Sequence, residues 1–66
     1  MINKVQILRK NKKITQEELA RIVGVTRQTI ISIESGKYIA SLSLALKLAQ
    51  VFDKPVEEIF ILEDGE

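Results

Sequence analysis

The 66-residue sequence contains no cysteine and no histidine, and it has only one proline and three glycines. Without cysteine the chain cannot form disulfides or thiolate metal sites, and without histidine it lacks the usual proton shuttle and imidazole ligand. Glycine-rich phosphate-binding loops are also absent from the sequence. We therefore expect a protein that is not an enzyme and that binds no cofactor or metal.

The sequence also lacks an apolar run that could cross a bilayer. Its most apolar stretch, LSLALKLAQVF at residues 42–52, includes Lys47 and is too short, because a spanning helix needs about 20 residues. The first residues, MINKVQILRKN, lack the apolar core of a signal peptide. We expect a cytoplasmic chain without membrane association, folded as a single domain over residues 1–66.

The charges are divided unevenly along the chain. Residues 1–40 hold eight Lys and Arg against three acidic residues, a net charge of +5, whereas residues 41–66 hold two Lys against six acidic residues, a net charge of −4. A basic half on so small a protein indicates a surface that faces a polyanion. The alternative is that these charges only form solvated faces.

Local signals predict the first two helices. Apolar residues at helical spacing indicate a helix over residues 3–11. Thr15 and Glu18 form a T-x-x-E capping box, which starts a second helix at Gln16. Gly24 marks the end of this helix, because glycine adopts the left-handed conformation without a side-chain penalty.

A turn of about three residues leads to a third helix. Thr26 is a suitable N-cap for it, and the helix is expected to end at Ser35. So short a connection makes the two helices cross steeply. Ala20 and Ile30 have the compact side chains that such a crossing requires.

Residues 42–52 and 56–60 have the patterns of a fourth helix and a short fifth helix. The fourth is apolar on almost every side, so we expect it to be nearly all buried. One interpretation of Ile39, in the loop before it, is that its side chain packs inward.

A set of residues between about positions 5 and 60 follows a known pattern. These residues are Gln16, Leu19, Ala20, Val23, Gly24, Val25, Ile30, Ile33 to Lys37, Ser41, Leu42, Ala45 to Ala49 and Pro55 to Phe60. The set resembles the lambda-repressor-like, or XRE, family of DNA-binding regulators. The resemblance implies an all-α, five-helix domain with its helix-turn-helix over residues 15–36, and it leaves open a short extended or β segment at the termini.

The resemblance implies that the helix over residues 26–35 enters the major groove, where each base pair presents a distinct pattern of donors and acceptors. Arginine suits guanine, glutamine suits adenine, serine can bond several bases, and isoleucine can cover a thymine methyl group. The alternative is that the polar residues of this helix are ordinary solvated side chains. The predicted base contacts are Arg27, Gln28, Ser32 and Ile31.

Phosphate contacts are implied at the start of the second helix, the end of the third and the loop beyond. The predicted residues are Thr15, Gln16, Thr26, Thr29, Ser35, Lys37, Tyr38 and Ser41. Capping is the safer assignment for the side chains of Thr15, Thr26 and Ser41. A glutamate late in the third helix would repel phosphates if it faced DNA, so Glu34 should be held elsewhere. The resemblance implies that it forms a structural salt bridge with Arg9.

Four apolar residues in a row lie near the end of the sequence, where so small a fold can hardly bury all of them. Exposed apolar surface usually marks an interface, and relatives of this size commonly dimerise through the last helix and the tail. We interpret residues 55–66 as a dimer interface. The alternative is that the tail folds back on the first helix and Ile2 as a short strand or extended segment, and the two arrangements are compatible. The predicted interface residues are Val56, Ile59, Phe60, Ile61 and Leu62.

The resulting functional prediction is a sequence-specific transcriptional regulator, a repressor that binds a palindromic operator as a homodimer. The fold leaves no room for a ligand pocket of ordinary size, so we expect no small-molecule ligand. Two alternatives stay open. One is the antitoxin of a toxin–antitoxin pair, whose tail would hold a protein partner, and the other is a protein-interaction adaptor without specific DNA binding.

Overall fold

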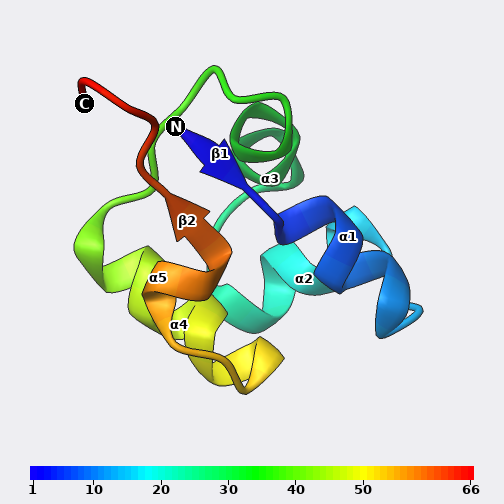
Figure 1. The fold of residues 1–66 in the computed structure, drawn as a ribbon. Helices are drawn as coiled ribbons and strands as arrows, with labels where there is room; N and C mark the ends of the chain where they lie inside the picture. Colours follow the sequence, from blue (N-terminus) through cyan, green and yellow to red (C-terminus); the bar gives the residue numbers. More distant parts are fainter.

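The computed structural model describes all 66 residues and contains five α-helices and two short β-strands (Figure 1). In chain order the elements are β1 (Ile2–Asn3), α1 (Val5–Asn11), α2 (Gln16–Val23), α3 (Arg27–Glu34), α4 (Leu42–Phe52), α5 (Val56–Ile59) and β2 (Phe60–Ile61). This architecture confirms the predicted five-helix fold with a small β segment at the termini. None of the helices is long and apolar enough to cross a membrane.

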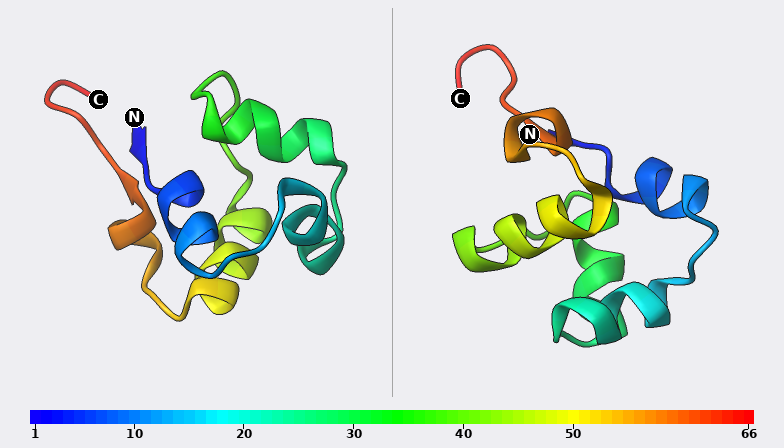
Figure 2. Two further views of the ribbon diagram at one scale, coloured as in Figure 1. Left: turned by 90° about the vertical axis from the view of Figure 1, so that its right-hand side faces the viewer. Right: turned by 90° about the horizontal axis from the view of Figure 1, so that it is seen from below.

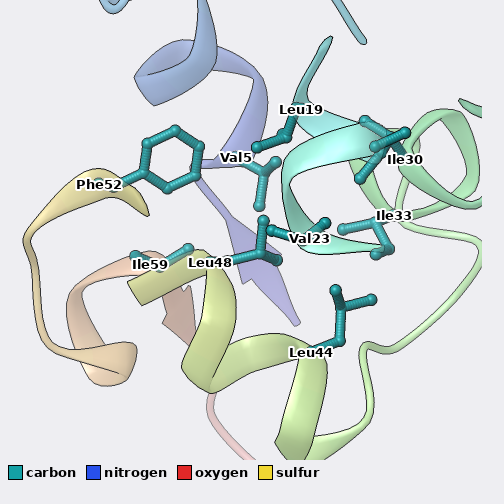
Figure 3. Packing of buried hydrophobic residues seen from close by; sticks show 10 residues of the cluster. Val5, Leu19, Val23, Ile30, Ile33, Leu44, Leu48, Phe52 and Ile59 are labelled. Carbon is teal, nitrogen blue, oxygen red and sulfur yellow. The ribbon is translucent and has the colours of Figure 1, made fainter. Parts of the chain in front are cut away.

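The hydrophobic core takes side chains from all five helices (Figure 3). Leu48 of α4 is fully buried, and Ile59 of α5 is buried on the same side of the molecule. Ala20 and Ile30 are also buried, as the predicted crossing of α2 and α3 requires. The core residues are Val5, Leu19, Ala20, Val23, Ile30, Ile33, Leu44, Leu48, Phe52 and Ile59.

The predicted capping box is present at the start of α2. Thr15 Oγ1 accepts a hydrogen bond from the backbone N–H of Glu18 at 3.0 Å, and Glu18 Oε1 accepts one from the backbone N–H of Thr15 at 2.8 Å. The Thr15 backbone N–H lowers the pKa of the Glu18 carboxyl below its ordinary value. The ionised Glu18 carboxylate therefore stabilises the fold fully above the ordinary glutamate pKa, and this contribution is lost as the pH falls through the lowered pKa.

The two strands form an antiparallel ribbon that joins the ends of the chain. Ile2 pairs with Ile61 and Asn3 pairs with Phe60. Helix α5 consequently ends at Ile59, one residue earlier than expected, because Phe60 takes the extended conformation that strand pairing requires. The structure thus shows the alternative in which the tail folds back on Ile2.

Strand pairing shows that the prediction of one interface residue was wrong. Ile59 has no exposed surface, because strand pairing draws the last turn of α5 over the core, so its side chain cannot contact a partner. Two expectations about the neighbouring elements were also wrong. Leu42 is 73% exposed and Leu46 is 51% exposed, since α4 packs on one side only, and Ile39 is 67% exposed instead of packing inward.

The burial of Ile59 predicts a large difference between two isoleucine substitutions. Ile59→Ala should lower the free energy of unfolding by about 2–5 kcal/mol, because it leaves a cavity in the core. Ile7→Ala is the matched control, since Ile7 is 60% exposed on α1 and lies outside the predicted dimer interface, and it should change stability by less than about 0.5 kcal/mol. Urea unfolding followed by circular dichroism measures both, and equal losses would contradict the assignment of Ile59 to the core.

Candidate nucleic-acid interface

Helices α2 and α3 form the centre of the candidate interface, and they cross steeply at one end of the molecule (Figure 2). Gly24 allows the tight turn between them with a φ of 77°. The backbone N–H of Val25 donates to Ala20 O at 2.9 Å, which closes the end of α2. The Oγ1 of Thr26 then accepts from the backbone N–H of Thr29 at 3.3 Å and begins α3.

The side chains of α3 divide between the core and the surface. Ile30 and Ile33 are fully buried against the rest of the fold. Of the four predicted base contacts, two are exposed at the start of the helix and two are half-buried further along it. The exposed pair is Arg27 and Gln28, and the half-buried pair is Ile31 and Ser32.

Arg9 and Glu34 form the ion pair that the family resemblance implied. Arg9 Nε lies 2.7 Å from Glu34 Oε2, and the two side chains are only 10% and 4% exposed. Arg9 Nη1 also donates to Ile14 O at 2.9 Å, and Gln16 Nε2 donates to Glu34 Oε1 at 3.1 Å. The negative charge of Glu34 is therefore held inside the fold by α1 and α2, away from any ligand on the exposed face of α3.

Two polar hollows bring most of the predicted contact residues together. One lies between the start of α2 and the start of α3, and it is lined by Arg9, Thr15, Gln16, Glu17 and Arg27. The other lies along α3, and it is lined by Thr26, Gln28, Thr29, Ser32 and Tyr38.

Three of the predicted phosphate contacts already serve as helix caps. The side chains of Thr15, Thr26 and Ser41 accept bonds from the backbone N–H groups at the starts of α2, α3 and α4. Capping is the role that we expected for them. Three other predicted phosphate contacts are exposed after α3 and cap no helix, namely Ser35, Lys37 and Tyr38. Ser35 Oγ donates a hydrogen bond to Ser32 O at 3.0 Å.

One contact behind α3 was not foreseen. The Asn3 side chain, on β1, donates from Nδ2 to Ile33 O at 2.9 Å, so the terminal ribbon holds the last turn of the helix. Neighbouring Glu34 is held by Arg9. Nothing local in the sequence marks this bond, because 30 residues separate its two partners.

The electrostatic asymmetry expected from the sequence has a spatial counterpart. Helix α5 and the C-terminal residues lie at the end of the molecule away from α2 and α3 (Figure 2). Five of the acidic residues belong to this end, namely Glu57, Glu58, Glu63, Asp64 and Glu66. The exposed face of α3 is therefore distant from the main concentration of negative charge.

Known proteins resemble this chain over most of its length. The helix-turn-helix family model matches residues 5–59, from α1 to the end of α5. An uncharacterized HTH-type transcriptional regulator of Methanocaldococcus jannaschii is 53% identical over 66 residues, the whole of both chains. YgzD, an uncharacterized HTH-type transcriptional regulator of Bacillus subtilis, is 48% identical over 64 residues, 97% of each chain.

A solved structure is similar as well. The restriction-modification controller protein C.AhdI of Aeromonas hydrophila matches with a TM-score of 0.77 and 35% sequence identity. The match covers 86% of this chain and 83% of that protein. The sequence match and the structural match therefore indicate the same helix-turn-helix fold.

The buried ion pair predicts a specific pattern of stability changes. Arg9→Ala should cost about 3–5 kcal/mol in the free energy of unfolding, because it leaves the Glu34 carboxylate buried without its partner. The double variant Arg9→Met, Glu34→Leu should recover most of that loss, since no charge is then left unpaired. Urea unfolding measures both, and a loss near zero for Arg9→Ala would refute a structural role for the pair.

Proposed function

This chain belongs to the helix-turn-helix family, and from that premise we propose that it is a transcriptional regulator, a repressor that binds a palindromic operator as a homodimer. Helix α3 lies in the major groove in this proposal. The observation that carries it is the exposed polar face at the start of α3, which borders two polar hollows and is far from the acidic end of the chain.

The base contacts are assigned to the first two turns of α3, the part of a recognition helix that reaches base edges. Arg27 is exposed at the first position, and its guanidinium can donate two bonds to O6 and N7 of guanine. Gln28 can accept from N6 and donate to N7 of adenine. Ile31 is placed to cover a thymine methyl group, and Ser32 lies one turn beyond Gln28.

Phosphate contacts are assigned to the rims of the two hollows and the loop after α3. Lys37 and Tyr38 are exposed in that loop, and Ser35 precedes them. The first backbone N–H groups of α2 and α3 supply further donors, because the N-terminus of a helix favours a phosphate. Thr15, Thr26 and Ser41 contribute through the helix ends that they cap, and Gln16 and Thr29 lie in the adjoining turns. Such contacts fix the position of the protein without reading sequence.

The dimer interface is assigned to an apolar hollow between the ribbon, α4 and α5. It is lined by Met1, Ile39, Ala40, Leu42, Ala45, Val56 and Phe60. A second copy seated here would cover Leu42 and Ile39, which are 73% and 67% exposed. Val56 and Phe60 line the hollow and remain in the proposed interface. The proposal also keeps exposed Leu62 and half-buried Ile61 in the interface, and it excludes buried Ile59.

Dimer geometry suits the proposed operator. Each molecule measures 34 Å along its longest axis. A two-fold pair of this size can present two α3 helices about 34–36 Å apart, one turn of B-DNA, which matches a palindromic site. Repression then needs no further domain, because a bound dimer that overlaps a promoter blocks access to it.

Selection of bound DNA duplexes from a random pool tests whether the protein binds DNA sequence-specifically. The protein should enrich a palindromic sequence, and Arg27→Ala should cost about 1–3 kcal/mol and relax preference at one base pair in each half-site. Lys37→Ala is the matched control, because loss of a phosphate contact should weaken binding to every sequence and reduce the salt dependence. Equally weak binding to all sequences by the unaltered protein would favour the adaptor alternative.

Introducing a charged side chain into the apolar hollow tests whether this surface forms the dimer interface. Leu42→Glu should give monomers in analytical ultracentrifugation and weaken operator binding, while the fold is kept, because a glutamate suits the first turn of α4. Ile7→Glu is the control, since Ile7 is 60% exposed on α1 and does not line the hollow. A purely monomeric unaltered protein with full operator binding would refute the homodimer.

A further inference from the structure

Two side chains on the exposed face of α3 are hydrogen-bonded to each other. Gln28 Nε2 donates to Ser32 Oγ at 3.4 Å, one helical turn further along. Both residues line the same hollow with Thr26, Thr29 and Tyr38, so hydroxyl groups surround the amide and no charged side chain lines its site. The Gln28 amide thus has a hydrogen-bond partner on its own helix, and that partner is the Ser32 hydroxyl.

The backbone of Ser32 is held in place by several hydrogen bonds. Its carbonyl oxygen accepts from the backbone N–H groups of Lys37 at 3.0 Å and Tyr38 at 3.2 Å, and from Ser35 Oγ at 3.0 Å. The loop after α3 thus ties down the backbone of Ser32, and its half-buried side chain has a single rotatable bond before the oxygen. Gln28 is exposed and has three such torsions, so it gains the most from being held.

We propose that Ser32 is a positioning residue that directs the Gln28 amide toward adenine, and that Ser32 does not itself read a base. This inference rests on the proposed function. An amide nitrogen carries two N–H groups. One of them is directed to Ser32, and the other, together with Oε1, forms the donor and acceptor edge that adenine N7 and N6 require.

The same bond disfavours guanine at this position. Guanine presents two acceptors, O6 and N7, in the major groove. A glutamine amide would need both of its N–H groups to satisfy them, and Ser32 already occupies one. The Gln28 and Ser32 pair therefore selects adenine over guanine, whereas Gln28 alone could turn its amide to suit either base.

The test compares binding of five proteins to the selected operator and to a copy in which the adenine read by Gln28 is replaced by guanine in both half-sites. The unaltered protein should prefer adenine by about 5- to 100-fold for each half-site that is replaced. Gln28→Ala and Ser32→Ala should each reduce this preference several-fold at the same base pair. The double variant should lose no more preference than Gln28→Ala alone, because the two residues act as one unit.

Ser32→Thr keeps a hydroxyl at the same position and should retain most of the preference, which separates positioning from a general loss of structure. Thermal unfolding of each variant verifies that α3 is intact. The proposal is overturned if Ser32→Ala relaxes a different base pair, or if its effect adds to that of Gln28→Ala, since either result makes Ser32 an independent reader. Absence of any base preference in the unaltered protein would instead show that the proposed function fails.

Discussion

The ion pair between Arg9 and Glu34 is the constraint on which the arrangement of this protein depends. It joins α1 to the last residue of α3, and the same guanidinium donates to the carbonyl oxygen of Ile14, in the segment between α1 and α2. Gln16 completes the network from the first turn of α2. A buried carboxylate is costly unless it is paired, so a packing of these three helices that parted Arg9 from Glu34 would be disfavoured. The first turns of α3 are left free at the surface.

A second constraint comes from the size of the chain. Ten residues make up the buried cluster, and five short helices cannot cover every apolar side chain. The terminal ribbon uses part of the tail to close the core over Ile59, but Leu42 and Leu46 of α4 stay exposed. The apolar hollow that Leu42 lines and the acidic residues at the end away from α3 (Figure 2) give the molecule distinct faces. In our account one face binds a second copy and the other binds DNA, and each leaves the other accessible.

The parts of the fold that depend on neighbouring residues could be predicted from the sequence. The capping box at Thr15 and the left-handed turn at Gly24 act within a few residues, and both are present in the structure. The pairing of Arg9 with Glu34 spans 25 residues and was accessible only through resemblance to a family. The burial of Ile59 and the bond from Asn3 to Ile33 were not predictable, because both depend on the ribbon that brings the two ends of the chain together. The exposure of α4 was missed for a different reason: Ser43, Lys47 and Gln50 do mark its exposed side, but the apolar residues Leu42 and Leu46 lie on that same side and make the helix look almost wholly apolar in the sequence.

The central claim is that α3 presents its first turns to DNA while its last turn is held by the fold. Backbone amide chemical shifts of the ¹⁵N-labelled protein, followed during titration with its selected operator duplex, test this most directly. We expect the largest changes in Arg27 to Ser32, at the start of α2 and in the loop at Lys37 and Tyr38, with small changes in α4. Large changes confined to α4 and α5, with the first turns of α3 unaffected, would contradict it.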